Sequence, residues 1–226
     1  MRVERAVVLA AGLGTRLKWL TRDRPKALMP LRGGDAVIER VIRRLAAAGI
    51  HDVAINVHHH GQQLMRALGD GRRLGARLYY SVEDELLDSG GGVRQALRLL
   101  PGDGPLAVHN ADILTDLDVT RLARHCPEGG ACLGLVDNPP HHPRGDFALR
   151  GGQVMADGGP RLTFAGVSVW DPVALRRWPA GARFPLTAAI RALMAEGRCA
   201  GVRHEGWWFD IGRPADWLRA RRANVR

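Results

Sequence analysis

The feature that most limits the folds open to this 226-residue chain is a regular alternation of strand-like and helix-like segments in its first half. Runs typical of buried strands cover residues 5–10, 52–57, 76–82 and 105–110. Helix-like segments lie between them, at residues 36–48, 61–68 and 89–100. Such β-α-β repetition predicts a parallel sheet with right-handed crossovers and helices on both faces.

The pattern changes after about residue 130. Shorter strand-like segments separated by turns cover residues 131–136, 145–150 and 161–170. A helix at 185–196, strands near 199–210 and a final helix from about 213 complete the chain. Because no linker or repeat interrupts this order, we predict one α/β domain with a mixed, mostly parallel, Rossmann-like sheet. Residues from about 131 to 226 would then form the second wall of a cleft.

The carboxyl ends of the predicted strands are polar or rich in glycine. They read AAGLGTR, NVHHH, SVEDE and HNAD. Ligands of open parallel sheets bind beyond these ends, so we expect the functional cleft there. The three histidines at 58–60 look like a metal tract, but neighbouring side chains on a strand point in different directions. We therefore interpret them as a polar strand end.

The charge balance is strongly basic, with a net charge of +10 and a pI near 10.9. All but two of the 33 basic residues are arginine. Such a balance is found in proteins that bind nucleic acids or membranes. Here the arginines are dispersed, and no segment interleaves basic with aromatic residues. Attraction of small anionic substrates is the favoured interpretation, and nucleic-acid binding is the alternative.

No apolar run approaches the length of a membrane-spanning helix, and the first ten residues are typical of a strand, not of a signal peptide. The three cysteines, Cys126, Cys132 and Cys199, are scattered without the spacing of metal ligands. We therefore expect a cytoplasmic protein with reduced cysteines.

A glycine-containing loop, AAGLGTR, directly follows the first predicted strand. Gly12 and Gly14 permit backbone conformations closed to other residues, so several N–H groups of the loop can turn toward one anion. Arg16 adds a fork of donors suited to phosphate. The loop lacks the G-K-[ST] ending of a Walker A loop. Phosphate binding is one interpretation, and an ordinary strand-to-helix turn is the other.

The two lysines of the chain, Lys18 and Lys26, both lie shortly after this loop. Lys26 stands between Pro25 and the apolar run ALMPL. An ammonium group in such a position must face a cleft or carry a large desolvation cost. Arginine cannot reproduce the compact point charge of lysine, so this residue favours a phosphate-binding role over a side chain that reaches the surface.

The composite signature of residues 9–30, G-x-G-x-R followed by P-K-x-L-x-P, resembles that of the sugar-1-phosphate nucleotidyltransferases. The family commonly has Pro-Leu-Thr where this chain has Trp19-Leu20-Thr21, which alters the loop's stiffness but no charged group. SVEDELLDSGGGVRQAL, NPPHHPRGDFALR and FAGVSVWDP are similar to segments of the N-acetylmuramate α-1-phosphate uridylyltransferases. These are small members of the family, without a C-terminal β-helix domain.

The resemblance implies a role for individual residues. Arg16 and Lys26 would be catalytic, residues from about 1 to 130 would bind the nucleotide, and those from about 131 to 226 would bind the sugar phosphate through Asp146 and Gly166. The implied nucleotide-binding residues are Ala11, Gly12, Gly14, Thr15, Arg16, Lys26, Glu83, Ser89, Gly90 and Asn110. Glu83 can accept a hydrogen bond from the imide N–H of uracil, and the glycines after Ser89 would let the ring approach. Guanine also offers donors, so this does not settle the base.

Two aspartates at predicted strand ends are candidate ligands for Mg²⁺, which prefers carboxylate and phosphate oxygens. Asp112 in HNAD and Asp210 in WWFDIG match aspartates of the family's motifs, with Ala111 in place of a glycine. The alternative for Asp112 is that it caps the next turn, as Asp116 or Asp118 also could.

The expected function is transfer of UMP from UTP to N-acetylmuramic acid α-1-phosphate in cell-wall sugar recycling, with Mg²⁺ as cofactor. The nearest alternative is a guanylyl- or thymidylyltransferase for a mannose, heptose or glucose 1-phosphate. From another class, a non-catalytic sensor of nucleotide sugars would have lost Lys26 or an aspartate, and all are present.

Overall fold

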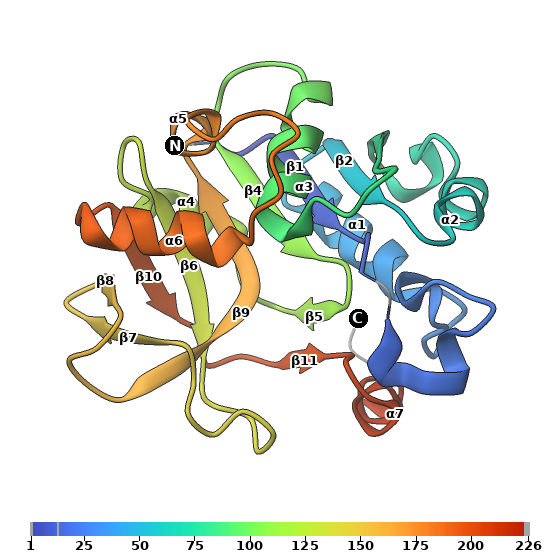
Figure 1. Ribbon diagram of the computed structural model, residues 1–226. Coiled ribbons are helices and arrows are strands. Elements are labelled where there is room, and N and C mark those ends of the chain that lie inside the picture. Colours follow the sequence, from blue (N-terminus) through green and yellow to red (C-terminus); the bar gives the residue numbers. More distant parts are fainter. Residues whose placement is uncertain (1, 13, 224–226) are drawn as a thin grey trace.

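A computed structural model describes residues 2–12 and 14–223, without the side chains of residues 15, 18 and 19. It contains a nine-stranded sheet and a separate two-stranded ribbon (Figure 1). The strands of the sheet are β1 (Arg5–Leu9), β2 (Asp52–Val57), β3 (Arg77–Val82), β4 (Leu106–Asn110), β6 (Ala131–Val136), β7 (Phe147–Arg150), β8 (Gln153–Met155), β9 (Arg161–Trp170) and β10 (Cys199–Arg203). The ribbon consists of β5 (Ile113–Thr115) and β11 (Trp208–Asp210).

The order of the strands is β3-β2-β1-β4-β9-β6-β10-β8-β7. In the described part of the chain, β9 and β8 alone run against the direction of the other strands. The strands β1 to β4 are mutually parallel, as the repetition in the first half predicts. β9 pairs antiparallel with both β4 and β6 and so joins the two halves in one sheet. The predicted mixed, mostly parallel sheet is confirmed.

Helices cover both faces of the sheet, as predicted. The helices α1 (Val37–Ala47), α2 (Gly61–Leu68) and α4 (Val119–His125) pack in one core cluster, together with Ala6 and Val8 of β1. On the other face, α3 (Asp88–Ala96), α5 (Pro172–Arg176) and α6 (Leu186–Ala195) pack with Val7. The alternation of side chains along a strand explains why neighbouring residues of β1 enter opposite cores. The C-terminal helix α7 (Pro214–Arg222) lies near the N-terminal loops (Figure 1).

Short elements are the part of the fold that the sequence patterns missed. These are the strands β5 and β8, the helices α4 and α5, and the 3₁₀ helices Thr15–Thr21, Lys26–Leu28 and Arg72–Leu74. Three to seven residues are too few to show a helical or alternating period. In the case of α4, the Asp118 side chain accepts a hydrogen bond from the Thr120 amide at 2.8 Å, so Asp118 is the residue that caps the helix.

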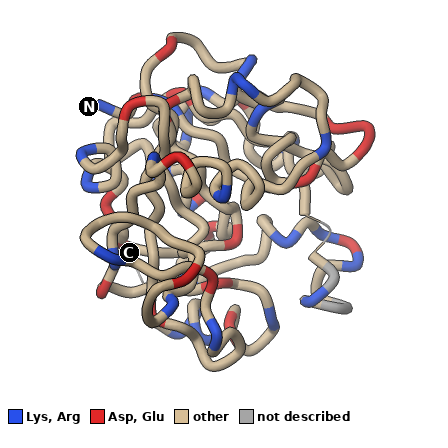
Figure 2. Tube along the Cα trace, turned by 60° about the vertical axis from the view of Figure 1, so that its left-hand side comes forward, with Lys and Arg blue, Asp and Glu red and all other residues tan. Residues whose placement is uncertain are grey.

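The charged residues are dispersed over the fold. Basic and acidic positions are interspersed along the whole trace in Figure 2, with no continuous basic stripe in that view. This agrees with the dispersed arginines of the sequence. Across residues 2–12 and 14–223, no helix combines the length and the apolar character needed to cross a bilayer.

The first long helix, α1, is amphipathic, and its start is fixed by a side chain. Its buried residues are Val37, Ile38, Val41, Ile42 and Leu45. The Glu39 carboxylate accepts a hydrogen bond from the Ala36 amide at 2.7 Å, which satisfies one free N–H of the first turn. The helix therefore has a fixed start and one apolar face against the sheet.

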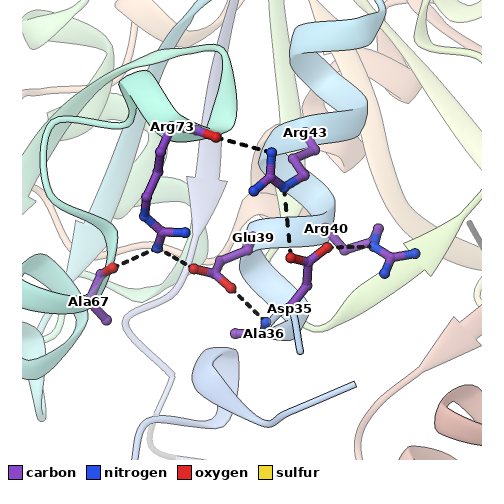
Figure 3. Close-up of polar contacts among 7 residues, drawn as sticks. All are labelled: Asp35, Ala36, Glu39, Arg40, Arg43, Ala67 and Arg73. Atoms are coloured by element: carbon purple, nitrogen blue, oxygen red, sulfur yellow. Dashed lines mark hydrogen bonds and ion pairs between the residues drawn. The ribbon is translucent and has the colours of Figure 1, made fainter. Parts of the chain in front are cut away.

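An ionic network on the exposed side of α1 joins this helix to the segment that follows α2 (Figure 3). Arg73 donates to Glu39, and the Arg43 guanidinium donates to the Arg73 carbonyl at 3.0 Å. Asp35 pairs with Arg40 at 3.3 Å and with Arg43 at 3.8 Å. Because the arginines are partly exposed, each pair contributes at most about 1 kcal/mol, and the network mainly fixes the orientation of the helix.

Candidate active site

The ribbon β5–β11 brings the two predicted metal-binding aspartates together. Ile113 lies opposite Asp210 in the ribbon, and the Ile211 amide donates to the Asp112 carbonyl at 2.9 Å. Asp112, which directly precedes β5, therefore lies at the same end of the ribbon as Asp210, the last residue of β11. Burial raises the pKa of Asp210, and the nearby charge of Asp112 raises it further. Two carboxylates in this arrangement repel each other unless a cation lies between or beside them.

Lys26 supplies one positive charge at this point. Its Nζ atom donates to the Asp112 carboxylate, and only 12% of the lysine side chain is exposed. The ammonium group thus points into the cleft, as the apolar neighbours of Lys26 predict. Gly14 has a φ of +65°, and a Cβ atom there would lie 3.2 Å from the Cβ of Lys26. The glycine lets the loop turn back over the lysine stem.

Two cavities of about 340 and 350 Å³ meet at Asn110 and Asp112, which line both. The first cavity also contains the predicted residues Ala11, Gly12, Glu83 and Ser89. The second cavity also contains Arg16, Asp146, Gly166 and Asp210. Among the residues that line these cavities, most of those assigned to the nucleotide lie in the first and those assigned to the sugar lie in the second, with Asp112 shared by both and Arg16 in the second. Such paired hollows suit a reaction that joins two bound molecules.

A bulge in β9 makes room for Asn110 at this junction. The pairing of β9 with β6 shifts register between Leu133 and Leu135. Opposite the shift, Gly166 has a φ of +73°, and a Cβ atom there would lie 2.7 Å from the Asn110 Nδ2 atom. The predicted residue Gly166 therefore lines the second cavity and also lets Asn110 reach the cleft.

A buried hydrogen-bond chain underlies the first cavity. The Ala10 amide donates to the Asn56 Oδ1 atom at 2.8 Å, and Asn56 Nδ2 donates to Glu83 Oε1, also at 2.8 Å. The second Glu83 oxygen accepts from the Leu87 amide at 3.1 Å. Asn56 and Glu83 are 3% and 4% exposed. The chain fixes the glycine loop relative to the loop before α3.

Glu83 thus has a structural task that the sequence did not indicate. It lines the first cavity, as expected, but both of its oxygens already accept hydrogen bonds within the protein. Contact with a base stays a prediction for this residue. Asn56 was missed, although a polar residue near the end of a buried strand is a signal that could have identified it.

Gly90 and Gly91, which follow Ser89, do not line the first cavity. The Gly90 and Gly91 amides donate to the Phe184 carbonyl at 2.9 and 3.0 Å. A Cβ atom on Gly90 would lie 2.8 Å from that same oxygen. These glycines let α3 approach the segment before α6, and the expectation that they also admit a base stays a prediction. Ser89 lines the cavity, and its Oγ atom accepts from the Leu186 amide at 2.9 Å.

Replacing Gly92 by alanine should destabilise the protein, although alanine in a helix normally stabilises by up to about 1 kcal/mol. The new Cβ atom would lie 2.5 Å from Asn56 Nδ2 and 2.7 Å from Glu83 Oε1. We expect a loss of about 1–3 kcal/mol in the free energy of unfolding, measured in urea, and a raised KM for the nucleotide. Gly159, where a Cβ atom would meet nothing within 4 Å, is the control. A Gly92→Ala variant as stable as Gly159→Ala would contradict this account.

The N-terminal loop agrees with the sequence prediction in part. Gly14 has the positive φ that was expected, whereas Gly12 does not, and a Cβ atom on Gly12 would meet nothing within 4 Å. The space around Gly12 is open to the first cavity. Arg16 lies in the second cavity. The side chain of Thr15 lies outside the described part of the structure.

The donor set at the junction fits Mg²⁺. This ion commonly takes one or two carboxylates from a protein together with phosphate oxygens of a substrate, and Asp112 and Asp210 both line the second cavity. No group of three or more His, Cys, Asp or Glu side chains in the described residues is arranged to hold a metal. His58, from the histidine tract, instead shares a hydrogen bond with the Glu83 carbonyl at 2.8 Å.

The site combines a glycine loop beyond a parallel strand, a lysine paired with an aspartate, and two adjoining cavities. These features suit the transfer of a group between phosphates. A family model described as "Nucleotidyl transferase" matches residues 5–149, and the chain belongs to this family of enzymes.

Proteins of similar sequence show which kind of nucleotidyl transferase this chain is. The chain is 39% identical to the N-acetylmuramate α-1-phosphate uridylyltransferase of Neisseria meningitidis serogroup B, over 92% of this chain and 93% of that protein. It is 34% identical to the protein of the same name from Caulobacter vibrioides, over 95% and 94%. A mannose-1-phosphate guanyltransferase of Aspergillus fumigatus is 30% identical, over 95% of this chain and 62% of that protein. The chain is thus a sugar-1-phosphate nucleotidyltransferase.

Solved structures show the same fold. A proposed glucose-1-phosphate thymidylyltransferase from Bacillus anthracis superposes with a TM-score of 0.85 at 18% identity, over 98% of this chain and 96% of that one. HddC from Yersinia pseudotuberculosis, in complex with GMP-PN, gives 0.79 at 18%, over 99% and 100%.

Proposed function

We propose that this enzyme transfers UMP from UTP to N-acetylmuramic acid α-1-phosphate, giving UDP-N-acetylmuramic acid and pyrophosphate, in the recycling of cell-wall sugar. The observation that carries the proposal is the junction of the two cavities, where Lys26, Asp112 and Asp210 converge. The names of the two relatives that match nearly full length favour uridylyl transfer to this sugar.

The proposed nucleotide site is the first cavity. The loop of Ala11 and Gly12 faces it from one side, and Glu83 and Ser89 face it from the other. The phosphates of UTP would lie along the open side of Gly12 and extend toward Arg16 and Lys26. The positive charges of these residues would stabilise the outgoing pyrophosphate, because charge moves onto it as the bond to the α-phosphorus breaks.

The sugar phosphate would enter through the second cavity and attack the α-phosphorus in line with the leaving pyrophosphate. Asn110 lines both cavities and would align the two substrates. Mg²⁺ held by Asp112 and Asp210 would neutralise phosphate charge during the transfer. No covalent enzyme intermediate is needed. Lys26 would keep the attacking and attacked phosphates close despite their like charge.

A panel of triphosphates and sugar phosphates, with release of pyrophosphate as the readout, tests the proposal. We expect UTP with N-acetylmuramic acid α-1-phosphate to give the highest kcat/KM. The relative from Aspergillus fumigatus keeps the alternative of guanylyl transfer to mannose 1-phosphate in the test. Turnover of GTP with mannose 1-phosphate, while the uridylyl reaction stays silent, would reject our choice of substrates. Silence with every pair would favour the non-catalytic sensor.

A further inference from the structure

The loop of residues 138–146 is a built wall of the second cavity. Asn138 holds it from inside, since its Nδ2 atom donates to the Pro143 carbonyl at 3.2 Å and the Arg161 carbonyl at 2.9 Å. The Thr163 hydroxyl donates to the Asn138 Oδ1 atom at 2.9 Å. Fixed in this way, the loop presents a histidine, His142, to the cavity.

The Asp146 carboxylate is already engaged within the protein, because it contacts His142. One of its oxygens lies 3.0 Å from the Nε2 atom of His142, and the other accepts a hydrogen bond from the Phe164 amide at 2.8 Å. With Nε2–H donated to Asp146, the remaining ring nitrogen of His142 is Nδ1. A protonated imidazole donates from both nitrogens, so a ring held by one carboxylate can bind a second one.

The position of this pair fits a group on the far side of a sugar ring. Phe164, which anchors Asp146, and Gly166, which contacts Asn110, are two residues apart on β9 and line the same cavity. Asp112 and His142 line this same cavity of about 350 Å³. A sugar with its 1-phosphate at Asp112 would therefore have its other ring substituents in the space that His142 faces.

We infer that His142, positioned by Asp146, binds a carboxylate carried by the sugar and thereby selects an acidic sugar 1-phosphate over its uncharged analogue. The inference rests on the proposed function, because muramic acid differs from glucosamine by a lactyl ether that ends in a carboxylate. Neutral hexose phosphates have no group for this histidine. The pair therefore determines specificity and takes no part in the phosphate chemistry.

The test compares N-acetylmuramic acid α-1-phosphate with N-acetylglucosamine α-1-phosphate in wild type, His142→Asn and Asp146→Asn. Both variants should lose about 10- to 100-fold in kcat/KM for the muramic substrate, mostly through KM. The ratio of kcat/KM for the muramic substrate to kcat/KM for the glucosamine substrate should therefore fall by about 10-fold or more. A role in folding alone would lower both values together. Arg144→Gln, which removes a charge from an exposed position of the same loop, is the matched control and should change neither.

The outcomes separate the inference from the proposed function. A wild-type enzyme without preference for the lactyl sugar would overturn both. A preference that persists in His142→Asn would overturn the inference and leave the proposed function intact. Arg213 is another cation in this cavity, so loss of the preference in Arg213→Gln but not in His142→Asn would also overturn it.

Discussion

Replacing Asp112 by asparagine should lower kcat by about 10²- to 10³-fold and leave the fold intact. The Asp112 carboxylate pairs with Lys26 and lies beside Asp210, at the junction of the two cavities. Asparagine has nearly the same shape but no charge. It would weaken the hold on Mg²⁺ and free the Lys26 ammonium from its partner. Both effects raise the barrier to phosphate transfer, since the charges no longer match those of the transition state.

Three measurements check this expectation. Initial rates of pyrophosphate release give kcat, a titration of the rate with Mg²⁺ gives the metal requirement, and thermal unfolding reports the fold. The matched control is Asp116→Asn, four residues further along the same segment. Its carboxylate lies 2.9 Å from the Nε2 atom of His204 and lines neither of the two cavities. If Asp112→Asn kept more than a tenth of wild-type kcat with an unchanged Mg²⁺ requirement, the metal assignment would be wrong.

The sequence predicts those residues of the site that lie at the ends of long, regular strands. Asn110 ends β4 and Asp112 follows it, Glu83 follows β3, and the glycine loop follows β1, so the parallel sheet alone places them at one edge. The period of the hydrophobic residues reveals such strands because each has five or six residues. The fold of the first half is therefore readable without coordinates.

The partnership of Asp112 with Asp210 depends on a different kind of element. β5 and β11 have three residues each and lie almost a hundred positions apart in the chain. Neither shows a period, and nothing local in the sequence states that they pair. A predicted strand end and the resemblance of WWFDIG to a family motif pointed to Asp210, but neither pointed to its pairing with the Asp112 segment. Its place beside Asp112 comes from the long-range β5–β11 ladder.

Two glycines also show what the sequence alone could not predict. The sequence marks Gly90 and Gly166 as places where something comes close, but it does not say what. At Gly90 the close neighbour is the Phe184 carbonyl, and at Gly166 it is the amide of Asn110. Both neighbours belong to the protein, because the half of the chain after residue 130 packs against the half before it. The functions of these glycines could be assigned only after this packing was known.

Replacing Lys26 by arginine should lower kcat/KM by about 100-fold although the charge is kept, and replacement by methionine should lower it by at least as much. The side chain is only 12% exposed: its Cβ atom lies close to Gly14, and its ammonium donates to Asp112. An arginine is longer, and its planar fork would bind the Asp112 carboxylate with two hydrogen bonds. These hydrogen bonds would draw the Asp112 carboxylate away from Asp210. They would also place the positive charge of the arginine beyond the reacting phosphates.

Initial rates over a range of concentrations of each substrate, together with thermal unfolding, distinguish geometry from charge. Arg24→Lys makes the reverse exchange at an exposed position two residues away and should change neither rate nor stability. A Lys26→Arg enzyme with kcat/KM within threefold of wild type would mean that a positive charge suffices at this point. A slow arginine variant that keeps its thermal midpoint would instead show that the compact ammonium is required. That requirement would explain why a chain that uses arginine for nearly all of its positive charge keeps lysine at position 26.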